Sequence, residues 1–263
     1  MIRLIASDLD GTLLHNGSQE VSKEMIELIK KLISRGILFV AASGRQYPNL
    51  RRLFEPVQND IAYICENGAL VMYKDQVLSK SFIDRSIGLE LLDDIRSKEG
   101  CEILLSGQAT SYLQPKLDSF AYHMEHVVHN NVTVVQDILT VTEPFYKISI
   151  CELAGIADHT GPYFINRWGD KLKATISGHA WLDFTHPDTN KGAALSSLLK
   201  KLSILPTEAM AFGDNYNDIE MLSNVTYGYA MDNANEDIKA ICSYHTSSVE
   251  KTLADFVNQH TSI

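Results

Sequence analysis

The sequence Asp8-Leu9-Asp10-Gly11-Thr12-Leu13-Leu14 directly follows residues 2–7, a short apolar run that predicts a buried β-strand. In an extended chain Asp8 and Asp10 point to the same side, so their carboxylates converge where this strand ends. Such close like charges are costly unless a cation lies between them or one carboxyl group is protonated. A simple Asp-Gly turn, stabilised by Thr12, also accounts for an isolated motif of this kind. Other features of the sequence are needed to decide between a simple turn and an acidic site.

Residues 22–42 extend the first strand to a βαβ unit. Apolar side chains recur at helical spacing between residues 22 and 35, with Ser22 as the predicted N-cap and Gly36 just past the helix end. Residues 37–42 form a second continuous apolar run, which predicts another buried strand. A strand, a helix and a strand in this order predict a parallel sheet that is covered on both faces.

The C-terminal part of the chain repeats this alternation. Helices are predicted at 191–203, from 218, at 235–241 and from 248, and strands at 209–212 and 227–230. The two ends of the chain together predict an α/β core with a doubly wound, mostly parallel, Rossmann-like sheet. We assign residues 1–82 and 186–263 to this core, which is discontinuous in sequence.

The middle of the chain, residues 83–185, has a different pattern. Strand-like runs alternate there with amphipathic stretches, and they occupy residues 102–106, 132–135, 145–151, 172–177 and 180–184. This pattern predicts an inserted α+β domain with an antiparallel sheet. Residues 157–170 contain Gly161-Pro162 and interrupt the strand pattern, so they are a candidate for a substrate-facing loop.

Composition and charge limit the functions that the chain can have. The 263 residues carry a formal net charge of −10, which disfavours a broad surface for nucleic acid or for anionic lipid. The four cysteines lie far apart without metal-binding spacing, so we expect neither a zinc cluster nor a disulfide framework. The N-terminal apolar run is too short for a signal peptide, and no other stretch approaches the length of a membrane-spanning helix. We therefore expect a soluble cytoplasmic protein, monomeric or a weak homodimer, with no nucleic-acid or membrane partner.

Three more polar clusters stand at the ends of predicted strands or at the start of a predicted helix. Ser43-Gly44-Arg45 follows the second strand, where a hydroxyl and backbone N–H groups can hold phosphate oxygens, although a turn into the next helix explains it as well. Lys191 opens the helix 191–203 against the helix dipole, which indicates either a bound anion or a solvated surface lysine. Gly213-Asp214-Asn215-Tyr216-Asn217-Asp218 follows the strand 209–212 and can supply ligands for a hard cation, or simply cap the next helix. Taken together, the clusters favour a site for a cation and an anionic group.

In this order the motifs resemble the haloacid dehalogenase superfamily of phosphotransferases. The resemblance rests on residues 8–14, Ser43, Lys191 and residues 213–218, and it covers both ends of the chain. With Glu66-Asn67-Gly68-Ala69 and Asn190-Lys191-Gly192 added, the set is similar to the pattern of the Cof-type, or IIB, subfamily. The resemblance implies a Mg²⁺-dependent phosphatase that hydrolyses small phosphomonoesters, such as sugar phosphates, through an aspartyl-phosphate intermediate.

The resemblance also implies a role for each matching residue. Asp8 is implied as the nucleophile, and Asp10 as the acid that protonates the leaving group and the base that activates water. The implied ligands of Mg²⁺ are Asp8, the backbone carbonyl of Asp10, and Asp214. The implied contacts of the phosphoryl oxygens are the Leu9 backbone, Ser43, Gly44, Lys191 and Asn217, with Asp218 supporting Lys191 and the metal.

The position of the insert fits the same family. The interval from Asp10 to Ser43 holds only a helix and a strand, whereas the interval from Arg45 to Lys191 far exceeds a βα unit, as in members with a C2-type cap. Residues 83–185 are accordingly expected to form a cap that sets substrate specificity. Candidate substrate contacts in the cap are Arg167, Trp168, His179 and His186, residue types that also occur on surfaces and in packing.

Two other functions stay open at the level of the sequence. A phosphotransferase or phosphomutase would keep its phosphoenzyme, and Asp10 argues against this because a base two residues after the nucleophile speeds hydrolysis. A non-catalytic module that senses a phosphorylated metabolite would also use an acidic pocket on an α/β sheet. Such a module does not require an insert as long as residues 83–185.

Overall fold

The computed structural model describes residues 1–15, 17–177 and 179–259, which fold into two compact units. One unit, called the core below, comprises Met1–Arg45, Leu50–Ser79 and Asn190–Ile263. The other, called the cap, comprises Gln46–Asn49 and Lys80–Thr189. Apart from the short segment Gln46–Asn49, the chain passes from one unit to the other after Ser79 and Thr189, whereas the sequence suggested borders after residues 82 and 185.

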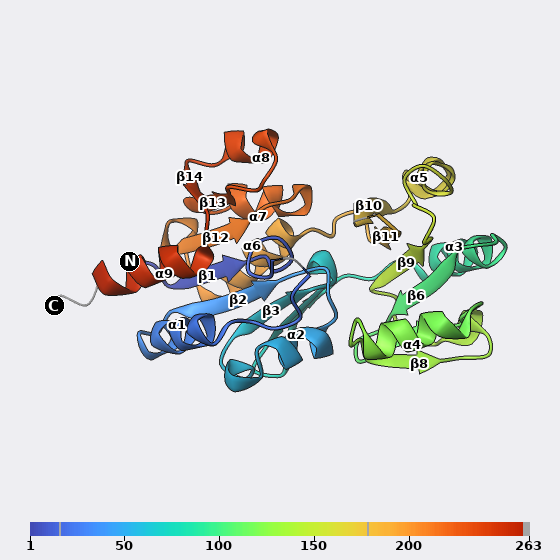
Figure 1. The fold of residues 1–263 in the computed structure, drawn as a ribbon, viewed down its shortest axis with the longest axis horizontal. Helices are drawn as coiled ribbons and strands as arrows, with labels where there is room; N and C mark the ends of the chain where they lie inside the picture. Colours follow the sequence, from blue (N-terminus) through green and yellow to red (C-terminus); the bar gives the residue numbers. More distant parts are fainter. Residues whose placement is uncertain (16, 178, 260–263) are drawn as a thin grey trace. The chain divides into compact units, whose positions relative to one another are not determined.

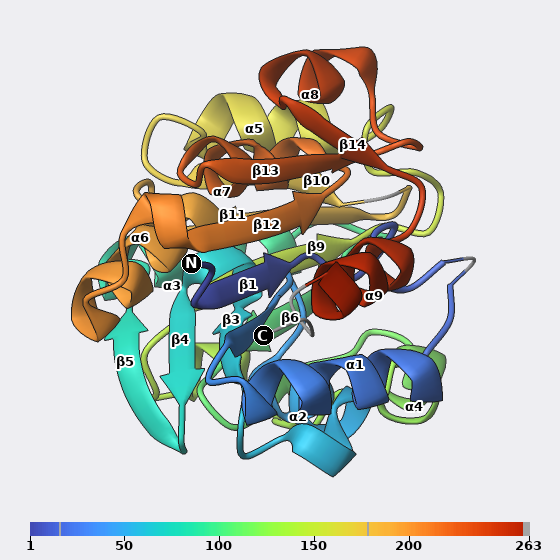
Figure 2. The same cartoon turned by 90° about the vertical axis from the view of Figure 1, so that its left-hand side faces the viewer.

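Within the described residues, the core is built on an eight-stranded sheet with the strand order β14-β13-β12-β1-β2-β3-β4-β5 (Figures 1 and 2). The strands are β1 (Leu4–Ser7), β2 (Leu38–Ala42), β3 (Ala62–Cys65), β4 (Leu70–Tyr73), β5 (Gln76–Lys80), β12 (Ala209–Gly213), β13 (Tyr227–Met231) and β14 (Tyr244–Thr246). All neighbours from β14 to β3 pair in parallel, and β4 turns back antiparallel to β3. This mostly parallel sheet confirms the predicted α/β fold class.

Helices cover both faces of the core sheet because its central strands are apolar on both sides. Leu4 and Ala6 of β1 belong to an apolar cluster with side chains of α6 (Lys191–Leu202), α7 (Ile219–Ser223) and α8 (Glu236–Ile241). On the opposite face, α1 (Lys23–Ser34) and α9 (Val249–Gln259) lie side by side, and α1 contacts β2 (Figure 2). The helix α2 (Tyr47–Leu53) follows β2 in the chain. Burial of the central strands by helices on both faces makes the sheet the rigid frame of the core.

The first helix of the core confirms the local signals in the sequence. Ser22 is the N-cap of α1, and its side-chain oxygen accepts a hydrogen bond of 3.0 Å from the backbone N–H of Met25. Gly36 follows the last turn with a φ of 73°, a left-handed conformation that glycine adopts without strain. The apolar stripe of α1, including Met25 and Ile29, is buried.

The cap, taken by itself, contains a six-stranded sheet with the order β10-β11-β9-β6-β7-β8 among the described residues. Its elements are α3 (Arg85–Arg96), β6 (Glu102–Ser106), β7 (Ser111–Leu113), α4 (Asp118–His126), β8 (Val132–Val134), β9 (Lys147–Cys151), α5 (Gly161–Trp168), β10 (Lys173–Ser177) and β11 (Trp181–Thr185). Neighbouring strands are antiparallel except for β7 and β8, which pair in parallel. An α+β unit is therefore present, as the alternation of patterns in the sequence predicted.

The substrate-facing loop predicted at residues 157–170 is wrong, because α5 occupies most of this segment. The helix begins at Gly161, and Pro162 lies in its first turn. Backbone N–H groups in the first turn have no partner within the helix, so the N–H group that proline lacks costs no hydrogen bond there. Phe164 and Trp168 are four residues apart and point to the same side, into the apolar cluster of the cap. The Gly-Pro pair marks the start of a helix rather than a loop.

The described part of the chain also bears on the cysteines and on membrane insertion. All four cysteines are free thiols, with Cys65, Cys101 and Cys151 buried and Cys242 half-buried. None of the helices in residues 1–15, 17–177 and 179–259 combines the length and the apolar character that crossing a bilayer would take.

The N-cap of α1 supplies a test of the fold. We expect Ser22→Ala to lower the free energy of unfolding of the protein by about 1 kcal/mol, because the N–H of Met25 loses its partner. Urea unfolding followed by circular dichroism measures this change. Ser34→Ala is the matched control, since the Ser34 hydroxyl only donates to the carbonyl of Lys31 at the exposed end of the same helix. Equal losses in both variants would contradict the capping role of Ser22.

Candidate active site

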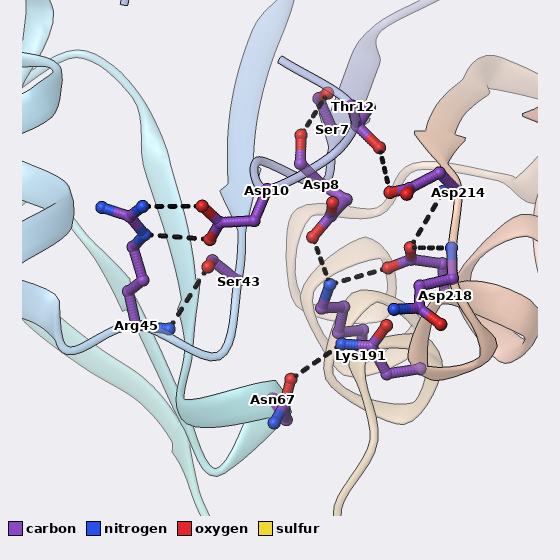
Figure 3. Close-up of polar contacts among 12 residues, drawn as sticks. Ser7, Asp8, Asp10, Thr12, Ser43, Arg45, Asn67, Lys191, Asp214 and Asp218 are labelled. Carbon is purple, nitrogen blue, oxygen red and sulfur yellow. Dashed lines mark hydrogen bonds and ion pairs between the residues drawn. The ribbon is translucent and has the colours of Figure 1, made fainter. Parts of the chain in front are cut away.

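Three chain segments bring charged side chains to one edge of the core sheet. Asp8 directly follows β1, Asp214 directly follows the neighbouring strand β12, and Lys191 is the first residue of α6. Since β1 and β12 run parallel, their carboxyl ends lie at the same edge, which is where open α/β sheets bind ligands. Figure 3 shows these side chains converging on one another.

Lys191 is fully buried and lies between two carboxylates. Its Nζ donates hydrogen bonds to Oδ1 of Asp8 at 2.5 Å and to Oδ1 of Asp218 at 2.7 Å. Burial by itself lowers the pKa of Lys191, but the charges of Asp218 and Asp8 outweigh it and raise this pKa above its usual value, so the lysine stays protonated. The alternative of a solvated surface lysine is therefore excluded.

Asp218 holds both Lys191 and the loop that follows β12. Its side chain is completely buried, and its Oδ2 accepts the backbone N–H groups of Asp214 and Asn215, each at 3.1 Å. Because Oδ1 of Asp218 takes the Lys191 ammonium group, both oxygens of this carboxylate are engaged. Asp218 thus sets the position of the lysine relative to the backbone of the Asp214 loop.

Asp214 is oriented from the loop after β1. Its Oδ1 accepts the hydroxyl of Thr12 at 2.8 Å, and its Oδ2 accepts the Nδ2 of Asn233 at 3.2 Å. Gly11 allows this approach, because a Cβ atom at Gly11 would lie 2.3 Å from Oδ2 of Asp214 and the φ of Gly11 is 94°. The Asp-Gly-Thr turn in the sequence is therefore part of the acidic site and not an alternative to it.

The acidic group fits a divalent cation. Asp8, Asp214 and Asp218 each place one carboxylate oxygen so that these three atoms lie within 4.8 Å of one another. Burial, followed by the charge of Asp218, raises the pKa of Asp8 well above its usual value, although Lys191 opposes this effect. Burial also raises the pKa of Asp214, again with a contribution from Asp218. A cation among these oxygens would offset the repulsion that raises both pKa values, and oxygen ligands suit Mg²⁺.

The side chain of Asp10 lies outside this cluster. Its carboxylate accepts two hydrogen bonds from the guanidinium group of Arg45, from Nε at 2.9 Å and from Nη2 at 2.6 Å, and Figure 3 shows it turned toward Arg45. The Asp10 side chain is 54% exposed, whereas that of Arg45 is 16% exposed. Arg45 also donates from Nη1 to Gln19 at 2.8 Å. No role was predicted for Arg45, although it belongs to the Ser43-Gly44-Arg45 motif. Its partner Asp10 lies 35 residues away along the chain and therefore leaves no local signal.

The residues implied to bind phosphate lie in the same core unit. Ser43 is buried at the end of β2, and its hydroxyl accepts the backbone N–H of Arg45 at 3.2 Å. Leu9 is buried in the loop after β1. Asn217 donates from Nδ2 to Oδ1 of Asn67 at 3.1 Å, and Asn67 had no assigned role in the sequence. Asn67 belongs to the Glu66-Asn67-Gly68-Ala69 motif, which contributed to the family resemblance. The motif alone did not indicate which residue the Asn67 side chain contacts.

The cap residues that the sequence offered as substrate contacts have other partners. Trp168 is buried and donates from Nε1 to Oδ2 of Asp94 at 2.8 Å, and Arg167 Nε lies 3.1 Å from the same oxygen, so both tie α5 to α3. The backbone N–H of Asp188 donates to Nδ1 of His186 at 3.2 Å. The His179 ring packs against Gly155, where a Cβ atom would lie 2.7 Å from Cε1 of the ring. These contacts position the four side chains within the cap, and their contact with substrate stays a prediction.

Comparisons with known proteins agree with the geometry. A family model described as haloacid dehalogenase-like hydrolase matches residues 5–255. The chain is 26% identical to the 5-amino-6-(5-phospho-D-ribitylamino)uracil phosphatase YbjI of Escherichia coli, over 94% of this chain and 91% of that protein. It is 28% identical to the HMP-PP phosphatase of Serratia proteamaculans, over 92% of this chain and 88% of that protein. A crystal structure from Eubacterium rectale superimposes with a TM-score of 0.87 at 29% identity, covering 97% of this chain and 99% of that one. The resemblance read from the motifs is confirmed, and so is the prediction of a phosphatase-type hydrolase.

The buried lysine supplies a test of the site that does not depend on activity. We expect Lys191→Met to lower the free energy of unfolding by about 3 kcal/mol in the presence of EDTA, because two buried carboxylates lose their only buried counter-charge in this group. Chemical unfolding measures the loss. Lys200→Met is the control, since Lys200 is an exposed residue of the same helix. A loss at Lys191 no greater than the loss at Lys200 would contradict the ion-pair arrangement.

Proposed function

The chain belongs to the haloacid dehalogenase-like hydrolases, and we propose that it hydrolyses small phosphomonoesters through an aspartyl-phosphate on Asp8. The observation that carries the proposal is the group formed by buried Asp8, Lys191 and Asp218 with half-buried Asp214 at the carboxyl ends of β1 and β12. This group combines a carboxylate nucleophile, the positively charged ammonium group of Lys191 and a set of carboxylates that can bind a metal ion. Phosphoryl transfer needs these elements more than it needs elaborate covalent chemistry.

Asp8 is the proposed nucleophile because a hydrogen bond to one of its two carboxylate oxygens fixes the orientation of its side chain. Lys191 holds Oδ1 of Asp8, which leaves Oδ2 as the oxygen that attacks phosphorus. The P–O bond to the leaving group breaks as the bond to Oδ2 forms, and the product is an acyl phosphate. Water then attacks this phosphorus, which returns Asp8 as a carboxylate and releases inorganic phosphate.

Asp10 is the proposed acid and base for the two steps. It donates a proton to the leaving oxygen in the first step and takes a proton from the attacking water in the second. Its half-exposed carboxyl group can exchange protons with solvent, and the Arg45 fork orients it two residues after the nucleophile. The same argument disfavours a phosphomutase or a sensing module, because neither gains from a group that promotes hydrolysis.

The proposed metal ligands are Asp8, Asp214 and the backbone carbonyl of Asp10. A bound Mg²⁺ would supply positive charge to the phosphoryl oxygens during transfer. Thr12 and Asn233 orient Asp214 for this role, and Asp218 keeps Lys191 beside Asp8. Ser43, Gly44, Asn217 and the Leu9 backbone complete the proposed phosphoryl contacts.

A small phosphorylated metabolite is the proposed substrate, and the cap is the proposed source of specificity. Two of the relatives are named as phosphatases, one of 5-amino-6-(5-phospho-D-ribitylamino)uracil and the other of HMP-PP. Small phosphate esters such as sugar phosphates are therefore the class in which we propose to search. A phosphate-release screen over a metabolite panel would identify the preferred substrate.

Substitution of the two acidic residues tests the chemistry. We expect Asp8→Asn to abolish hydrolysis of p-nitrophenyl phosphate, because an amide cannot form the acyl phosphate. Asp10→Asn should slow turnover by about 10²–10⁴-fold and let phosphoenzyme accumulate. Asp75→Asn, which removes an exposed carboxylate paired with Arg51, is the control and should leave turnover unchanged. Turnover that persists in Asp8→Asn would remove the nucleophile assignment.

Removal and return of the metal test the ligand set. We expect EDTA to stop turnover and Mg²⁺ to restore it. Mg²⁺ at 100 times its Kd should also raise the stability of the folded protein, by about 2.7 kcal/mol, because it binds only the folded state. Asp214→Asn should remove most of this stabilisation, as measured by thermal unfolding with and without Mg²⁺. Turnover in EDTA, or an unchanged response in Asp214→Asn, would reject the proposed ligands.

A further inference from the structure

The motif Glu66-Asn67-Gly68-Ala69 has a backbone that the proposed mechanism does not explain. It follows β3, and Glu66, Asn67 and Gly68 have φ values of 50°, 56° and 106°. Three consecutive residues are therefore left-handed, and two of them carry side chains. Such a conformation costs free energy for residues other than glycine, and it persists where the surrounding structure requires it.

Two neighbours of the site hold this turn in place. The N–H of Asn67 donates to the carbonyl of Ser43 at 3.0 Å, and the N–H of Glu66 donates to the carbonyl of Arg45 at 3.1 Å. On its other side the turn abuts the start of α6, since a Cβ atom at Gly68 would lie 2.4 Å from the carbonyl oxygen of Asn190. The turn is thus fixed between the loop of Ser43 and the residue before Lys191.

The turn aims the Asn67 side chain at two residues already implied in phosphate binding. Oδ1 of Asn67 accepts the Nδ2 of Asn217 at 3.1 Å. The same Oδ1 lies 3.1 Å from the position that a Cβ atom of Gly44 would occupy, so a side chain at that position would crowd it. Asn67 is half-buried and appears below Ser43 in the view of Figure 3.

The Asn67 carboxamide has donor capacity to spare. Its Nδ2 makes no hydrogen bond with any residue in the described ranges 1–15, 17–177 and 179–259. Each amide nitrogen of the Asn67–Asn217 pair carries two hydrogens, and the bond between the two side chains uses one of the four. At least one N–H of Asn67 is therefore available beside Gly44 and Asn217, and Nδ2 lies 3.2 Å from the position that a Cβ atom of Gly44 would occupy.

We propose that Asn67 binds the phosphoryl group directly, with Nδ2 donating to a phosphoryl oxygen while Oδ1 orients Asn217. The left-handed turn is what brings this amide to the loop of Ser43. This inference rests on the proposed function, because it requires a phosphoryl group beside Asp8. It adds a second asparagine, from the turn after β3, to contacts that the motifs place only after β1, β2 and β12 and on α6.

The experiment separates the amide from the backbone conformation. Glycine and aspartate both adopt left-handed φ readily, so Asn67→Gly removes the side chain and Asn67→Asp keeps its shape while replacing the donor with an anion. Binding of inorganic phosphate to the Mg²⁺-loaded protein is measured by calorimetry and by competition against p-nitrophenyl phosphate hydrolysis. We expect Asn67→Gly to weaken phosphate binding about tenfold and Asn67→Asp to weaken it further, with Mg²⁺ affinity unchanged. Asn224→Ala is the control, since Asn224 is exposed and its side-chain Nδ2 donates to the Ser196 hydroxyl, away from the proposed site.

Each outcome supports or overturns the inference. If the parent protein hydrolyses phosphate esters and the Asn67 variants bind phosphate as tightly as it does, the role of Asn67 is overturned while the proposed function stands. If the variants lose Mg²⁺ affinity and thermal stability together with phosphate affinity, Asn67 has a structural role only. A parent protein that neither turns over phosphate esters nor binds phosphate would overturn the proposed function and this inference with it.

Discussion

A fully buried ammonium group, held between two buried carboxylates, is the interaction on which the site depends. Removing the charges of Lys191, Asp8 and Asp218 from water is costly, and short hydrogen bonds of 2.5 and 2.7 Å offset that cost. The arrangement tolerates little displacement, because a buried charge that loses its partner is strongly destabilising. The start of α6 must therefore stay beside the end of β1, although Lys191 and Asp8 are 183 residues apart in the chain.

The parallel sheet makes this long-range arrangement possible. Parallel pairing of β12, β1, β2 and β3 brings the loops after four strands to one edge, each with a different chemical contribution. In chain order, the loop after β1 is the first and carries Asp8, and the loops after β2 and β3 carry Ser43 and Asn67. The loop after β12 is the last and carries Asp214 and Asp218. Gly11 lets the first and last loops touch, since only a residue without Cβ allows Asp214 to approach. The long segment of the cap, Lys80–Thr189, lies in the sequence between the loop of Asn67 and Lys191 and leaves the pairing of these strands intact.

Elements with local signals were predictable, and elements without them were not. Helix α1 followed from its apolar period and from Ser22, which caps it within three residues. Helix α5 did not, because Gly161-Pro162 is compatible both with a loop and with the first turn of a helix, and burial of Phe164 and Trp168 decides between them. The cap candidates Arg167 and Trp168 similarly acquired their partner, Asp94, from a helix that is remote in sequence. Packing energy resolves such cases, and a single sequence does not display it.

The sequence by itself determined the chemical groups of this protein, the alternation of strands and helices at the two ends of its chain, and the family to which its motifs belong. Those properties are local, since a carboxylate after a buried strand or a lysine at a helix start can be read from neighbouring residues. Only the tertiary structure decided that Lys191 is buried, that Asp10 is held by Arg45 and that Asn67 meets Asn217. These properties depend on hydrogen bonds of about 3 Å between residues far apart in the chain, and such bonds exist only once the sheet has brought the loops together.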